Sequence, residues 1–151
     1  GTDAARYFFT SRTLDSQMEF DIDLAKKESS ENPVYYIQYA NARIHSLLAQ
    51  AREAGCVWGG VDQTDFTLLK TDAELDLIKK MDTYHDLIAN AARIARYAYE
   101  LAGLFHHFYR ECRCLCDQPG LTQARLGLIL AVQYVLVHAM TILGVSAPEH
   151  M

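Results

Sequence analysis

Hydrophobic residues recur at steps of three and four along most of the chain, which is the spacing of α-helices that bury one face. The clearest such stripe consists of Ile37, Ala40, Ile44, Leu47 and Ala51. Asn32 followed by Pro33 is a typical helix start, because asparagine caps free N–H groups and proline fits the first turn. Gly55 is a typical helix end. The pattern therefore predicts a helix from Pro33 to about Gly55.

Weaker signals surround that segment. Short helices are expected over about residues 2–12 and 20–28. Residues 55–71 contain several glycine, aspartate and glutamine residues and predict a loop. Trp58 and Phe66 are large apolar residues within it, and we expect both rings to fold back onto the core.

A long helical pattern follows the loop. Thr71 and Glu74 have the spacing of a capping box, in which each satisfies a backbone N–H at the start of a helix. The pattern then continues to about Cys116, with a break expected near residues 82–83. Pro119–Gly120 is interpreted as a turn before the last helix.

The last helix is predicted over about residues 122–143, with Gly144 as its stop. Residues 126–143 are apolar almost all round, and their length is near the lower limit for a membrane span. Gln133 and His138 interrupt them and no basic flank sets an orientation, so a helix buried in a bundle is the better interpretation. The expected fold class is all-α: a helical bundle of three long helices with shorter ones around them.

Composition adds only a few constraints on the fold and the function. The chain has 151 residues, enough for one domain with a sizeable core, and a net charge of −5. It starts at Gly1 and shows no signal or transit peptide, so a fragment or processed chain is expected. Three of the four cysteines cluster at 112, 114 and 116 on one predicted helix, which favours reduced thiols and a cytoplasmic location. Steps of two on a helix point apart, so no metal site is expected, and Cys112 is taken as core with the other thiols partly exposed.

Candidate chemistry lies on the predicted helix over about 93–116. Its polar stripe consists of Arg96, Tyr99, Gly103, His106, Arg110 and Arg113, with Tyr109 at its border. Arginine binds phosphate and a flat ring stacks on an unpaired base, so this combination suits single-stranded nucleic acid. An ordinary solvated helix face with arginines is the alternative.

A second candidate stripe lies on the helix that begins at Pro33. Tyr36, Tyr39 and Arg43 fall on one side of it, beside the apolar positions. Tyrosine can bury its ring and leave its hydroxyl in water, so the same residues fit either a polar rim around the core or a binding surface. Periodicity does not decide between the two.

Several long segments resemble the C-terminal part of arginyl-tRNA synthetases. They are DAARYFFTSR at 3–12, DSQMEFDIDLAKKESSENPVYYIQYANARIHSLL at 15–48, LAGLFHHFYREC at 101–112 and LGVSAPEHM at 143–151. DAAR resembles the D-A-L-R signature of this family's anticodon-binding domain, with Ala5 in place of leucine, and Asn41 stands where histidine is usual. The resemblance implies an all-helical domain of the class I synthetase anticodon-binding type that grips the anticodon arm of the arginine tRNA.

The resemblance also implies site residues. In the family, the tyrosine of the FH-FY motif and the terminal methionine help to form the pocket for anticodon bases, roles that fall on Tyr109 and Met151 here. Spacing alone suggests that Arg113, one predicted helical turn after Tyr109, adds a phosphate or base contact. Residues 1–30 would then link to an absent catalytic domain, and residues 31–151 would form the anticodon-binding bundle.

The HIGH-like and KMSKS-like signatures that hold ATP in this class do not occur in the chain. By resemblance the parent enzyme uses ATP and Mg, while this part needs no cofactor and is expected to be inactive alone. The expected partners are the arginine tRNA and the missing catalytic domain, with no membrane and a monomeric state. Two alternatives stay open: a free-standing RNA-binding or regulatory relative, and a helical protein-interaction module.

Overall fold

The computed structural model describes residues 1–11, 22–29, 31–87 and 91–151, and these ranges contain helices and no strand. The helices are α1 (Thr2–Thr10), α2 (Ile22–Lys26), α3 (Pro33–Glu53), α4 (Asp72–Asp82), α5 (Ala91–Glu111) and α6 (Pro119–Ile142), with 3-10 turns η1 (Val61–Gln63), η2 (Phe66–Leu68) and η3 (Tyr84–Leu87). The expected all-α class is confirmed, and α3, α5 and α6 are the three long helices that the pattern predicts.

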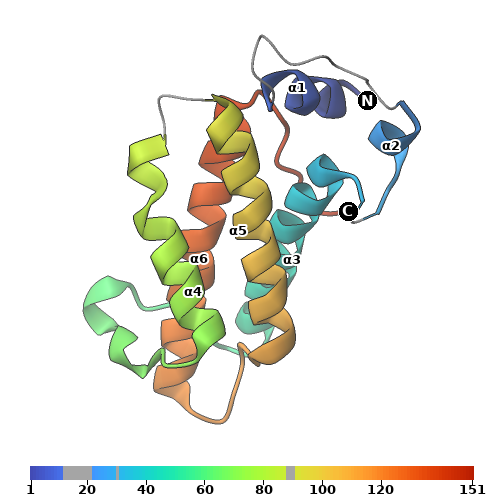
Figure 1. Ribbon diagram of the computed structural model, residues 1–151. Helices are drawn as coiled ribbons and strands as arrows, with labels where there is room; N and C mark the ends of the chain where they lie inside the picture. The colour runs from blue at the N-terminus through green and yellow to red at the C-terminus, as the bar shows by residue number, and fades with distance from the viewer. Residues whose placement is uncertain (12–21, 30, 88–90) are drawn as a thin grey trace.

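Four helices run side by side and the two N-terminal ones cover one end of them. α6 packs against α3, α4 and α5, while α1 and α2 lie across the end of the bundle at which α3 begins (Figure 1). The Tyr7 hydroxyl of α1 donates to the Ala95 carbonyl of α5 over 3.1 Å. The first helix is therefore docked on the bundle, and the domain boundary between residues 30 and 31 stays a prediction.

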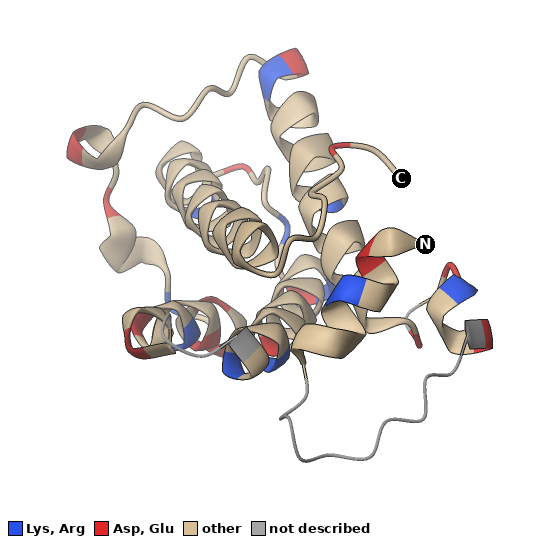
Figure 2. Ribbon diagram, turned by 90° about the horizontal axis from the view of Figure 1, so that it is seen from above, with Lys and Arg blue, Asp and Glu red and all other residues tan. Residues whose placement is uncertain are grey.

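The core is centred on α6. Leu126, Ile129, Val132 and Leu136 are almost fully buried there, and Arg125 is the one charged residue of the helix. Seen from above, the charged positions lie mainly on α4, α5 and the ends of the other elements (Figure 2). α6 is long and apolar enough to cross a membrane by length and composition, yet half of its most apolar stretch is buried within the bundle. This packing supports the interpretation as a core helix.

α3 forms as the sequence predicts. The Asn32 side chain accepts a hydrogen bond from the Val34 N–H over 3.2 Å, and Pro33 occupies the first turn. The whole predicted apolar stripe is buried, from Ile37 to Ala51. Gly55 adopts a φ of 75°, a conformation that glycine reaches without steric cost.

The segment between α3 and α4 folds back onto α6, as expected from its two large rings. Trp58 is partly buried and donates from Nε1 to Thr64 Oγ1 over 2.9 Å. A Cβ added at Gly127 of α6 would lie 2.8 Å from a Phe66 ring carbon and 2.9 Å from Trp58 Nε1, so the two rings require a glycine beneath them. The segment ends at Thr71, where the predicted capping box with Glu74 is confirmed.

Two predicted boundaries are wrong. α5 ends at Glu111, and Cys112 to Cys116 lie in the connection to α6. Pro119–Gly120 opens α6 in place of a separate turn. The reason is tertiary: Arg125 donates to the Arg113 carbonyl over 2.7 Å and Thr122 bonds both backbone groups of Cys116, which holds the connection away from a helical path.

Candidate nucleic-acid interface

The two polar stripes predicted on separate helices lie against each other. α3 packs on α5, and the rings of Tyr36 and Tyr99 are 5.2 Å apart, those of Tyr36 and His106 4.5 Å, and those of His106 and Tyr39 5.6 Å. We call this surface the seam; it consists of Tyr36, Tyr39, Arg43, Tyr99, His106 and Tyr109. The two stripes form one surface, which helical periodicity within a single helix could not reveal.

Arg43 is held at the centre of the seam. Its guanidinium carbon lies 4.5 Å from the centre of the Tyr39 ring and 4.2 Å from that of Tyr109. Nη2 donates to the Tyr39 hydroxyl over 2.7 Å, and Nη1 lies 3.3 Å from His106 Nδ1. Each cation–π contact contributes about 0.5–2 kcal/mol according to its exposure. The arginine is thus fixed by rings and a neutral polar group.

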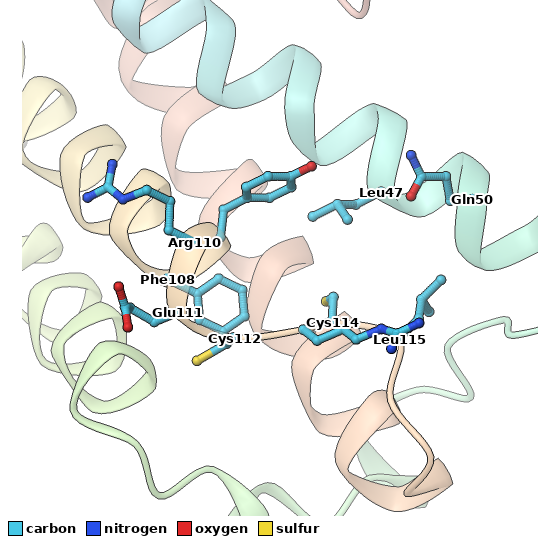
Figure 3. Close-up of a pocket in the computed structure, with 10 residues that line it drawn as sticks. Leu47, Gln50, Phe108, Arg110, Glu111, Cys112, Cys114 and Leu115 are labelled. Atoms are coloured by element: carbon cyan, nitrogen blue, oxygen red, sulfur yellow. The ribbon is translucent and has the colours of Figure 1, made fainter.

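A cleft of about 450 Å³ opens next to Tyr109, between α3 and the end of α5. Leu47, Phe108 and Leu115 are apolar residues of its lining, and Gln50 and Arg110 are polar ones (Figure 3). Gln50 follows Arg43 by seven residues and therefore belongs to the same side of α3. Helical spacing could have predicted it as a site residue, but its residue type gave no signal for binding. The cleft has the size and the mixed lining of a small-ligand site.

The cationic groups of this region differ in their partners. Within the described ranges, Arg43, Arg110 and Arg113 form no ion pair with an acidic side chain. Arg96, by contrast, donates from Nε to Glu100 over 2.8 Å. Arg96 is therefore partly neutralised and the weakest candidate of the predicted stripe.

His106 is not on a solvated face, although the sequence pattern places it on the polar stripe of its helix, opposite the apolar one. It is 4% exposed because its position on α5 faces α3. Burial lowers the pKa of His106 to about 4. The hydrogen bond to the Tyr36 backbone acts in the opposite direction, and the positive charges of Arg43 and Arg110 lower the pKa further. The imidazole is therefore neutral at pH 7.

Arg113 is also misplaced by the sequence pattern. Because α5 ends at Glu111, this residue does not follow Tyr109 by one helical turn. Its side chain is exposed and belongs to the lining of the cleft, in which Arg110 and Tyr109 also take part. The predicted proximity to Tyr109 is thus reached through the connection between α5 and α6.

The last residues of the chain pack against α3. The Asn41 amide is fully buried and donates to the Pro148 carbonyl over 2.8 Å, and Gln38 donates to the Ser146 carbonyl over 3.0 Å. Asn41 is two positions before Arg43, which contacts Tyr109 from the other side of the helix. Met151 is half exposed, and its pairing with Tyr109 stays a prediction.

The DAAR motif anchors the same segment. Arg6 donates to the Gly144 carbonyl over 2.7 Å, where Gly144 has a φ of 67°. Asp3 accepts hydrogen bonds from the Ser146 hydroxyl and from the Gln38 amide. These contacts fix the direction in which the chain leaves α6.

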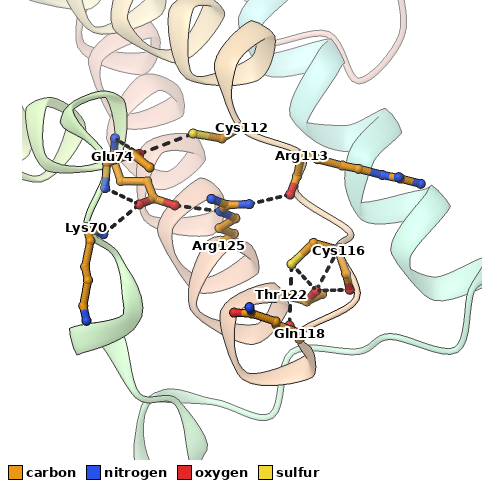
Figure 4. A network of polar contacts seen from close by, with 9 residues as sticks. Lys70, Glu74, Cys112, Arg113, Cys116, Gln118, Thr122 and Arg125 are labelled. Atoms are coloured by element: carbon orange, nitrogen blue, oxygen red, sulfur yellow. Dashed lines mark hydrogen bonds and ion pairs between the residues drawn. The ribbon is translucent and has the colours of Figure 1, made fainter.

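A buried polar network holds the far end of the cleft (Figure 4). Arg125 Nε donates to Glu74 Oε1 over 2.6 Å, and the second carboxylate oxygen accepts from the N–H groups of Lys70 and Thr71. Burial alone would raise the pKa of Glu74, but the hydrogen bonds from Thr71 and Arg125 outweigh it and lower that pKa. The network fixes the start of α4 against α6.

The cysteines next to this network behave partly as predicted. Cys112 is buried, but so is Cys114, which the sequence pattern had taken as partly exposed. Burial raises the pKa of the Cys114 thiol to about 12. Among the described residues no group of three or more His, Cys, Asp or Glu could hold a metal ion.

The all-helical fold agrees with the class that comparison with known proteins shows, an anticodon-binding domain. The model of the DALR anticodon binding domain matches residues 37–151, and the chain belongs to this family. It is 51% identical to an arginine–tRNA ligase of Desulforudis audaxviator over 100% of its own length and 49% identical to one of Symbiobacterium thermophilum over 99%. It spans 28% of the length of each. Arginyl-tRNA synthetase of Thermus thermophilus has a TM-score of 0.81 and 26% identity, with 99% of this chain and 26% of that chain covered.

Proposed function

We propose that the chain is the anticodon-binding part of an arginine–tRNA ligase and that it holds the anticodon arm of the arginine tRNA across the seam and the adjoining cleft. The observation that carries this proposal is an exposed aromatic ring beside arginines that have no acidic partner among the described residues: Tyr109, which is 38% exposed, with Arg43, Arg110 and Arg113 around it. Membership of the family and the similarity to arginine–tRNA ligases support it, and neither favours the free-standing relative or the protein-interaction module.

The geometry suits single-stranded RNA in a loop. The partly exposed Tyr109 ring and the apolar lining of the cleft would provide a surface on which an unstacked base gains about 1–3 kcal/mol. Arg110 and Arg113 belong to the lining of the same cleft and would contact the phosphates beside such a base. The one acidic residue in the lining, Glu111, points away from the Leu47–Gln50 wall (Figure 3). An anionic ligand would therefore meet mainly positive charge.

Arginine activation belongs, in this proposal, to a catalytic part outside the chain. That part would use ATP and Mg, and this chain would contribute by holding the tRNA while its acceptor end reacts. The chain alone is therefore expected to show no arginine-dependent ATP–pyrophosphate exchange, consistent with the missing HIGH-like and KMSKS-like signatures. A cytoplasmic location follows from the same proposal.

The test is binding of the 151-residue chain to arginine tRNA transcripts in a salt series. The wild-type transcript is compared with one that differs only in its anticodon and with an unrelated tRNA. We expect the cognate anticodon to bind at least tenfold more tightly, with an affinity that falls as salt rises. Equal affinity for all three would contradict anticodon recognition, and salt-independent binding would contradict phosphate contacts.

A further inference from the structure

His106 lies behind Arg43 in the seam and contacts both helices that form it. Its Nε2 is 3.3 Å from the Tyr36 carbonyl oxygen of α3, and its Nδ1 is 3.3 Å from Nη1 of Arg43. The residue comes from α5 and is 4% exposed. It therefore links the backbone of α3 to the arginine at the centre of the seam.

The partners of the two ring nitrogens fix the tautomer. A carbonyl oxygen only accepts, so Nε2 must carry the hydrogen that it donates to Tyr36. A guanidinium only donates, so Nδ1 must be the free acceptor that receives a hydrogen bond from Arg43. A single form satisfies both contacts, namely the neutral imidazole with hydrogen on Nε2. A second proton on Nδ1 would remove the acceptor and bring a positive charge against Arg43.

We propose that His106 is a positioning residue for Arg43. It holds the guanidinium against the Tyr39 and Tyr109 rings, in the position from which it binds RNA. This inference rests on the proposed function. A carboxylate in the same place would orient the guanidinium more strongly, but it would also cancel the charge that a phosphate needs. A neutral acceptor orients Arg43 and leaves its charge intact.

The surroundings support a fixed neutral group. Arg43 and Arg110 are the charged residues that face the imidazole, from α3 and α5, and the rings of Tyr36, Tyr39 and Phe105 pack around it. Both arginines disfavour a positively charged histidine, in the same direction as burial. The hydrogen-bond acceptor toward Arg43 is therefore present throughout the neutral pH range.

The experiment is a double-mutant cycle on tRNA affinity with Arg43→Ala, His106→Leu and His106→Asn. Leucine fills similar space without an acceptor, whereas the asparagine oxygen can stand where Nδ1 does. We expect His106→Leu to weaken tRNA binding about fivefold when Arg43 is present and less than twofold in the Arg43→Ala background. His106→Asn should recover most of the loss. Ile94→Val, a core change on the same helix, controls for general destabilisation.

A spectroscopic measurement tests the tautomer without RNA. The ¹⁵N shifts of His106 at pH 7 should show hydrogen on Nε2 and none on Nδ1. An imidazole with hydrogen on Nδ1, or an equal loss of affinity from His106→Leu in both backgrounds, would overturn the positioning role and leave the proposed function standing. Failure of the unmodified chain to bind any tRNA would instead overturn the proposed function, while the shifts would still report the tautomer.

Discussion

Two arginines of this bundle have opposite surroundings. Arg125 is 8% exposed and forms a short hydrogen-bonded ion pair with Glu74, whose other oxygen caps α4. Arg43 is partly exposed and contacts two tyrosine rings and a neutral histidine, with no carboxylate partner among the described residues. The first arginine has its charge fully compensated within the fold, whereas the second keeps its charge available.

The presence or absence of a carboxylate partner separates a structural arginine from a candidate binding arginine, which residue type alone does not. A buried charge must be paired, because an unpaired one costs several kcal/mol. A guanidinium between rings satisfies its hydrogen bonds and its apolar faces without losing its attraction for an anion. Both arginines lie near the cleft beside Tyr109, yet we assign only Arg43 to binding.

The largest effect is expected from Arg125→Leu. Removing this partner leaves the buried Glu74 carboxylate without its charged donor, and breaking such a pair costs about 3–5 kcal/mol. Urea unfolding should show this loss. Arg113→Ala is the matched control, because Arg113 joins the network only through its carbonyl. A loss of unfolding free energy below about 1 kcal/mol would contradict the structural role of Arg125.

His106 should make stability depend on pH. Its pKa is lowered from 6.5 to about 4 in the folded protein, so the unfolded chain binds the proton more readily between these values. The contribution of neutral His106 to the free energy of unfolding is therefore fully present above about pH 6.5. It declines by about 3 kcal/mol as the pH falls toward 4. Denaturation curves of wild type and His106→Asn should diverge by this amount. Glu74 and Glu100 titrate in both proteins, so parallel curves would contradict a buried neutral histidine.

The arginines around Tyr109 should outweigh Arg96. Replacing Arg110 and Arg113 together with alanine is expected to weaken tRNA binding about tenfold, since two exposed charge contacts of somewhat under 1 kcal/mol combine. The salt slope should fall by about 0.7 for each lost contact. Arg96→Ala should change affinity less than twofold, because Glu100 already compensates its charge. Unchanged binding and slope in the double variant would exclude these two arginines from the interface.

The smallest effect is expected at the tail. Deleting Glu149 to Met151 should leave the melting temperature nearly unchanged, because the anchors at Ser146 and Pro148 remain. Discrimination between cognate and altered anticodons should fall by about 1 kcal/mol, the scale of one stacking contact. Affinity for both transcripts is the measurement. An equal loss for both, or a large fall in melting temperature, would assign the tail to structure.

Most of the fold could be predicted from local signals. The stripe from Ile37 to Ala51, the Asn32 cap and the Thr71–Glu74 capping box are local rules, and the structure obeys all of them. The end of α5 could not be predicted, because it depends on hydrogen bonds from Arg125 and Thr122 of the next helix. Helical periodicity around Cys112 does not report hydrogen bonds from the next helix.

The residue types of the candidate site could be predicted from the sequence, but their arrangement in space could not. Both polar stripes were visible, yet their meeting in one seam depends on how α3 packs against α5. The same packing turns His106 from a surface residue into a buried one and brings Arg43 against the Tyr109 ring. The Arg96–Glu100 pair, by contrast, lies within α5 at a spacing of four residues. The roles of Tyr109 and Met151 rest on resemblance and stay predictions.

The central claim is that RNA engages Arg43 and its neighbours while Arg125 stays in the fold. The most direct measurement follows the arginine Nε–H signals of the ¹⁵N-labelled chain during titration with an anticodon stem-loop of the arginine tRNA. The account predicts that the signals of Arg43, Arg110 and Arg113 shift and that the signal of Arg125 does not. A shift of the Arg125 signal with the Arg43 signal unmoved would contradict it.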